Sequence, residues 1–208
     1  MRKELEHFRI GESYGGNQDW FSSFMMRLGG CGAETACDSC IYFALHMGFD
    51  KLYPYDLSQI TRKSYVDFAH VMEHYLWPRM TGINRLDIYT EWLGKYFRDC
   101  GETRIAMDTL DGNESAEAAE RAVIQQIDRG YPVPALILNH RDREMRDFNW
   151  HWFIINGYEE REDGLWVKTV TYSSYLWVNL RRLWDTGYNT RGGLVLYRIN
   201  DRDGSEGA

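Results

Sequence analysis

A cysteine between glycines is the residue of this sequence best suited to nucleophilic chemistry. Cys31 lies in Leu28-Gly29-Gly30-Cys31-Gly32, just where a loop gives way to a helical apolar pattern. Small neighbours permit a tight turn and close approach to the sulfur. The free amide groups at a helix N-terminus lower a thiol pKa and hold an oxyanion. We therefore predict that Cys31 is a nucleophile, the alternative being a buried structural cysteine beside a glycine turn.

A histidine about 120 positions later supplies the base that such a thiol requires. His151 opens the apolar run Trp152–Ile155, and its ordinary pKa suits proton transfer near neutral pH. A thiol nucleophile is activated by a neighbouring base of this kind. We pair His151 with Cys31 and keep His140, which follows an apolar run and precedes a charged loop, as the rival base.

The remaining cysteines and histidines allow a metal site to be considered. Cys37 and Cys40 fall on the apolar stripe of the helix that Cys31 begins, where cysteine packs as a small apolar residue. His70 and His74 are four apart on a second helix, but no third ligand pattern accompanies them. We expect core packing for the cysteines, a solvated helix face for the histidines, and no metal or cofactor.

The elements around these residues change type midway along the chain. Helical periodicity marks 31–45, 65–76, 86–97 and 113–130, with Gly48 as a stop signal. Strand patterns follow at 133–138, 152–155, 165–171, 175–180 and 194–199, with a turn expected at Asn156-Gly157. This order predicts an α+β protein of two lobes with a cleft between them. We assign 1–200 to a single domain, with a helical lobe at about 14–130, a mostly antiparallel sheet lobe at 131–200, and a flexible tail at 201–208.

Composition limits the classes of function. The chain has 208 residues, 44% of them hydrophobic, and a formal net charge of −7, which disfavours nucleic acid as a partner. No apolar run approaches the roughly 18 residues of a membrane span, and the first residues lack the apolar core of a secretory signal. The sequence predicts a cytoplasmic protein whose four cysteines are free thiols.

Three motifs together resemble the papain-like cysteine peptidases. They are Cys-Gly at a helix start, Gly-Tyr-Pro-Val-Pro at 130–134, and His-Trp-Phe-Ile-Ile-Asn-Gly-Tyr at 151–158. The chain is most similar to the branch that includes the peptidase domain of bacteriocin-processing (double-glycine leader) exporters and its stand-alone bacterial relatives. The resemblance covers about residues 14–199 and implies the papain-like two-lobe fold, with Cys31 as nucleophile and His151 as base.

The resemblance also implies two further roles. A family glutamine upstream of the cysteine contributes to the oxyanion hole, and Gln18 is its match, although thirteen residues separate it from Cys31 where the family usually has about six. An inserted turn over 20–28 is then expected to loop out. An Asp or Asn orients the histidine in relatives, and Thr171 is the best positional match here, its hydroxyl accepting the histidine N–H more weakly than a carboxylate does.

These residues predict a thiol-dependent hydrolase, a cysteine peptidase or amidase, whose partner is a peptide or other amide substrate. Acyl transfer through the same acyl-enzyme is the first alternative, because an amine then replaces water in the second half-reaction. A catalytically inactive papain-like binding module is the second. The sequence leaves the substrate and the oligomeric state open.

Overall fold

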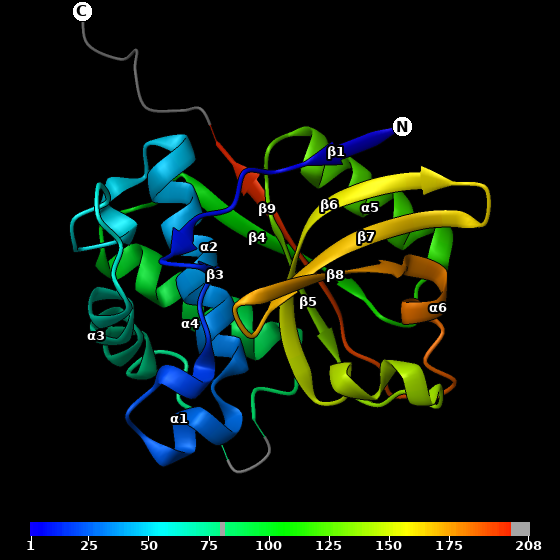
Figure 1. Cartoon of the computed structure of the whole chain (residues 1–208), viewed down its shortest axis with the longest axis horizontal. Coiled ribbons are helices and arrows are strands. Elements are labelled where there is room, and N and C mark those ends of the chain that lie inside the picture. Colours follow the sequence, from blue (N-terminus) through cyan, green and yellow to red (C-terminus); the bar gives the residue numbers. More distant parts are fainter. Residues whose placement is uncertain (80–81, 201–208) are drawn as a thin grey trace, which may run out of the picture.

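The protein is an α+β structure in which helices from the first half of the chain face an antiparallel sheet built largely from the second half (Figure 1). The computed structural model describes residues 1–79 and 82–200. The tail expected at 201–208 lies outside the described residues. Within them, no helix combines the length and the apolar character needed to cross a membrane.

The central helix of the helical half is buried along most of its length. It begins at Cys31 and ends at Gly48, as the stop signal there predicted. Gly48 adopts a left-handed conformation with φ of 71°. All of residues 31–44 are buried, polar and apolar alike, so the helix takes a central position in the core. The helices and 3₁₀ turns are η1 (Gln18–Trp20), α1 (Phe24–Gly29), α2 (Cys31–Met47), η2 (Asp50–Leu52), α3 (Arg62–Glu73), α4 (Leu86–Asp99), α5 (Ala116–Asp128), η3 (Arg143–Phe148) and α6 (Leu180–Trp184).

The main sheet has seven strands in the order β4-β9-β5-β6-β7-β8, and β1 pairs with β6 beside this path. Every pairing in it is antiparallel. A separate hairpin joins β2 and β3. The strands are β1 (Arg2–Glu4), β2 (Arg9–Ile10), β3 (Ser13–Tyr14), β4 (Ile105–Asp111), β5 (Val133–Ile137), β6 (His151–Arg161), β7 (Gly164–Thr171), β8 (Ser174–Asn179) and β9 (Gly193–Ile199).

Three local features differ from the sequence expectations. The prediction of a turn at Asn156-Gly157 is wrong, because β6 continues to Arg161 with only a register shift at that point. Gly157 there lies against β1, where an added Cβ would come within 3.0 Å of the Lys3 carbonyl oxygen. The half expected to be helical contributes β4 to the sheet, and the inserted segment after Trp20 contains the short helix α1.

Contacts at the junction of the two halves bring the start of α2 to the start of β6. Trp152, the second residue of β6, stacks on Tyr89 of α4 with ring centroids 4.2 Å apart. Its indole N–H donates to the carbonyl oxygen of Ile83 at 2.6 Å. A Cβ on Gly32 would meet Ile83 at 3.2 Å and Trp152 at 3.5 Å, so the second residue of α2 must be small for the helix to reach this position.

Candidate active site

Cys31 is held at the start of α2 by the glycine in front of it. Gly30 caps the helix, and its N–H donates to the carbonyl oxygen of Met26 at 2.8 Å. A Cβ on residue 30 would lie 2.2 Å from that oxygen, so glycine is needed where α1 passes into α2. Cys31 is 6% exposed; burial raises the pKa of its thiol, and the nearby backbone N–H of Trp152 opposes that rise.

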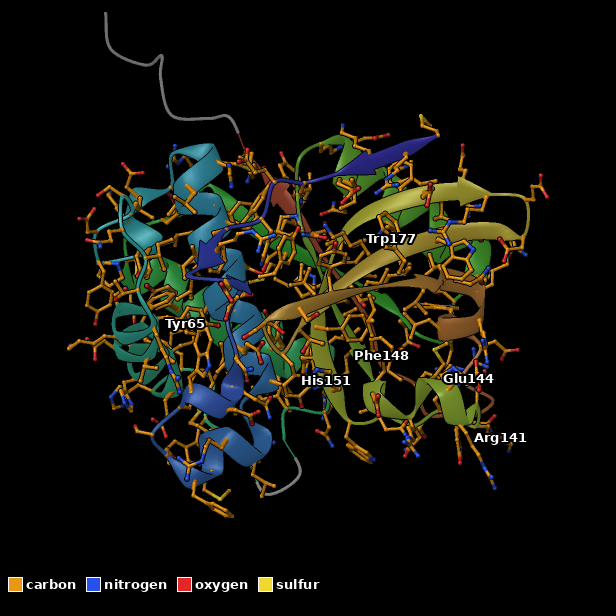
Figure 2. The ribbon with its side chains drawn as sticks, viewed as in Figure 1. Tyr65, Arg141, Glu144, Phe148, His151 and Trp177 are labelled. Atoms are coloured by element: carbon orange, nitrogen blue, oxygen red, sulfur yellow. The ribbon has the colours of Figure 1, made fainter. Side chains whose placement is uncertain are left out.

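His151 is the first residue of β6 and lies where the sheet meets the helical half (Figure 2). It is 4% exposed. Its Nε2 lies 2.7 Å from the Thr171 hydroxyl at the end of β7. The backbone N–H of Trp152, the very next residue, lies near enough to the Cys31 thiol to lower its pKa. The thiol therefore lies beside the backbone of His151, and the structure gathers Cys31, His151 and Thr171 in one place.

Burial governs the charge of the pair. It raises the pKa of the Cys31 thiol to about 11, and the Trp152 N–H only partly offsets that rise. It also lowers the pKa of His151 to about 4. The sequence predicted that the helix N-terminus would lower the pKa of Cys31. That prediction is wrong, because burial raises this pKa. At neutral pH the site holds a thiol and a neutral imidazole.

Gln18 reaches the neighbourhood of α2 but directs its side chain elsewhere. Its backbone N–H donates to the carboxylate of Glu34 at 3.2 Å, one turn after Cys31. Its side-chain amide donates to the carbonyl oxygen of Arg27 at 2.9 Å, while its side-chain oxygen is buried without a partner. The segment 20–28 folds back through α1 and so brings Arg27 to Gln18. The amide nitrogen keeps a second hydrogen for another acceptor.

An apolar pocket of about 350 Å³ opens beside Cys31. Its walls come from α1, from the segment before α4, from the end of β5 and from the residue before His151. Arg79 adds one charged side chain to the lining. The apolar lining residues are Met25, Leu28, Ile83, Leu136, Leu138 and Trp150. A pocket of this character accepts an apolar group next to the thiol.

The rival base His140 is engaged elsewhere. Its Nδ1 accepts from the backbone N–H of Asp142 at 3.0 Å, and its Nε2 donates to the carbonyl oxygen of Arg182 at 2.9 Å. It lines a different, polar pocket of about 790 Å³. Its neighbour Arg141 lies at the outer edge of the sheet half, away from His151 (Figure 2). Both nitrogens of His140 thus have partners that do not include Cys31.

The other thiols and imidazoles form no metal site among the described residues. Cys37 and Cys40 are completely buried, as the apolar stripe predicted. His70 bonds the Ser22 hydroxyl at 2.8 Å and lies 3.4 Å from a Glu73 carboxylate oxygen. Within 1–79 and 82–200, no three His, Cys, Asp or Glu side chains are grouped so as to hold an ion.

Two residues of the site escaped the reasoning from sequence. Tyr172 stacks on the His151 ring with centroids 4.9 Å apart and planes 3° apart. Glu34 is a buried acid on the first turn of α2. The sequence carried a signal for the second, because a charge within an apolar helix stripe requires partners. It carried none for Tyr172, whose position depends on the backbone of the turn between β7 and β8.

Comparison with known proteins adds no relative. No protein-family model, no curated protein and no solved structure matches this chain.

Proposed function

We propose that this protein is a thiol-dependent hydrolase of the papain-like kind, acting on a peptide or other amide with Cys31 as nucleophile and His151 as base. One observation carries the proposal: Cys31, at the start of a helix, and Trp150, the residue before His151, line the same pocket, and a Cβ on Gly32 would lie 3.5 Å from Trp152, the residue after His151. The proposed nucleophile and base come from distant parts of the chain but lie close to one another, and both are buried.

The arrangement supports acyl transfer to sulfur. Because Thr171 engages Nε2 of His151, Nδ1 is the nitrogen left to take the thiol proton. The sulfur attacks the amide carbonyl carbon, the proton passes to His151, and the imidazolium then protonates the leaving amine. Water hydrolyses the resulting thioester and regenerates the thiol. Since both groups are neutral at rest, the proton moves as the sulfur attacks.

We assign the oxyanion donors to the first turn of α2 and to Gln18. The backbone N–H of Cys31 lies at a helix N-terminus, where unpaired amide groups favour negative charge. The second hydrogen of the Gln18 amide is the side-chain candidate. Removing one such donor typically slows the chemical step by about a hundred- to a thousandfold.

The pocket beside Cys31 indicates the substrate's character. Its apolar walls and volume of about 350 Å³ suit a leucine- or phenylalanine-sized side chain flanking the reacting carbonyl. We therefore choose an ester of an N-acylated leucine as the reporter substrate.

Trapping the acyl-enzyme tests the proposal. The p-nitrophenyl ester of N-acetyl-leucine should leave an acetyl-leucyl group on Cys31, seen by mass spectrometry of the acid-quenched protein, and Cys31→Ser should carry none. Release of the group in buffer alone supports hydrolysis. Release that requires an added amine indicates acyl transfer, and absence of any adduct indicates a binding module.

A further inference from the structure

Glu34 is a buried acid that the chemistry proposed above does not use. It is the fourth residue of α2, one turn after Cys31, and is 4% exposed. Burying a carboxyl group is costly unless hydrogen bonds compensate. Its side chain therefore requires an explanation in terms of what it contacts.

Both of its backbone donors belong to segments of the candidate site. The N–H of Gln18 donates to Oε2 at 3.2 Å, and the backbone N–H of Tyr172 lies close enough to the carboxyl group to lower its pKa. Gln18 is the oxyanion candidate, and Tyr172 stacks on His151. One carboxyl group thus links the first turn of α2 to the two segments that carry these side chains.

The turn at Tyr172 needs such support. Tyr172 and Ser173 have φ values of 49° and 61°, a left-handed conformation that is uncommon for residues with a side chain. The N–H of Ser173 donates to the Gly16 carbonyl oxygen at 2.9 Å. Ser173 is thus hydrogen-bonded to Gly16 and the Tyr172 N–H lies beside Glu34, so both turn residues contact the N-terminal half.

The surroundings of Glu34 also bear on its charge. Burial, with smaller contributions from Asp38 and Asp19, raises the pKa of Glu34 to about 8, even though the backbone N–H groups of Gln18 and Tyr172 oppose the rise. When ionised, Glu34 in turn raises the pKa of Cys31. The other titratable groups that face it are Cys37 on α2, Tyr65 on α3 and Tyr172.

We propose that Glu34 is a positioning residue of this site: its carboxyl group holds the Gln18 segment and the Tyr172 turn against α2, and its ionisation suppresses the reactivity of Cys31. The proposal deepens the proposed function, since it concerns the same thiol. The Glu34 carboxyl group can accept hydrogen bonds from both N–H groups whether it is protonated or ionised. Only the ionised form repels a thiolate one helical turn away.

Alkylation of Cys31 by iodoacetamide, followed by peptide mapping from pH 6 to 10, tests the charge effect without a substrate. Glu34→Gln should alkylate Cys31 about fivefold faster than the wild type above pH 8, where the wild-type carboxyl group is ionised. The two rates should converge near pH 6, where it is protonated. Glu91→Gln, an exposed acid on α4, is the matched control and should follow the wild type at every pH.

Amide hydrogen exchange tests the positioning effect on the same proteins. Glu34→Ala should speed exchange at Gln18 and Tyr172 about tenfold or more, because it removes both acceptors, whereas Glu91→Gln should leave both unchanged. The inference would be overturned if the alkylation rates of Glu34→Gln and the wild type were equal, or differed by the same factor at every pH. It would also be overturned if Glu34→Ala left the exchange rates of Gln18 and Tyr172 unchanged. Failure of the proposed function shows differently, as the absence of an acyl adduct on wild-type Cys31.

Discussion

Removing the hydroxyl that bonds His151 should disturb the site far more than removing a similar hydroxyl on the same strand. Thr171 Oγ1 lies 2.7 Å from His151 Nε2, and His151 is 4% exposed, so Thr171→Val leaves a buried ring nitrogen without a partner. An unsatisfied buried group costs about 1–3 kcal/mol. If the transition state for acylation is destabilised by this amount, the reaction slows about 5- to 150-fold.

Thr169 provides the matched control. It lies on the same strand, is 1% exposed, and donates its hydroxyl to the Leu176 carbonyl oxygen at 3.1 Å instead of to the histidine. Thr169→Val should lower the free energy of unfolding by about 0.5–1.5 kcal/mol yet acylate at nearly the wild-type rate. Thr171→Asn should also acylate well, because its amide oxygen can accept the imidazole N–H.

The assay is the burst of p-nitrophenolate from the N-acetyl-leucine ester, with urea unfolding measured in parallel on each variant. The expected order of burst rates is wild type, close to Thr169→Val and Thr171→Asn, then Thr171→Val well below. Equal burst rates for Thr171→Val and Thr169→Val would refute the assignment of Thr171 as the group that orients His151.

Two further predictions concern stability. Folded Glu34, with its pKa raised to about 8, keeps a proton that the unfolded chain has released, so its contribution to the free energy of unfolding should fall as pH rises from 6.5 to 8. His151 acts in the opposite direction near pH 6.5, because it is neutral when folded but partly protonated when unfolded. The Glu34 effect is therefore measured as the difference between the wild type and Glu34→Gln, which should lack up to about 2 kcal/mol of this pH-dependent change in urea titrations; the same pH dependence in both proteins would contradict the raised pKa. Gly30→Ala should destabilise the protein by about 1–3 kcal/mol, because its Cβ meets the Met26 carbonyl oxygen at 2.2 Å, whereas Gly94→Ala in α4, where the nearest contact is an ordinary 3.4 Å, should leave the melting temperature unchanged or raise it.

The sequence was sufficient for elements whose pattern is local. The apolar stripe after Cys31 and the glycine at 48 located α2, and the alternating residues of β7 and β8 located that hairpin. β4 was missed because its residues Ile105–Asp111 are mostly part-exposed, so its strand character depends on pairing with β9 nearly ninety positions away. The six-residue helix α1 is too short for a period to show.

The site divides in the same way. Cys31 and His151 were proposed from residue type and from their positions at element starts, and Thr171 from the resemblance to the papain-like peptidases. The charge states were not, because they depend on burial: the fields of the helix N-terminus and of the backbone N–H groups are weaker than the desolvation of a thiol that is 6% exposed. The stacking of Tyr172 on His151 depends on the left-handed conformation of Tyr172 and Ser173. No local propensity favours that conformation in tyrosine or serine.

The most direct test of the central claim compares two histidine variants in the acylation of Cys31. His151→Ala should slow formation of the acetyl-leucyl adduct by about a hundredfold or more, since general-base assistance typically contributes about 10²–10⁴ in rate. His140→Ala, which removes an imidazole engaged with Asp142 and Arg182, should acylate as the wild type does. Equal rates for His151→Ala and the wild type, or a loss confined to His140→Ala, would contradict the assignment of His151 as the base for Cys31.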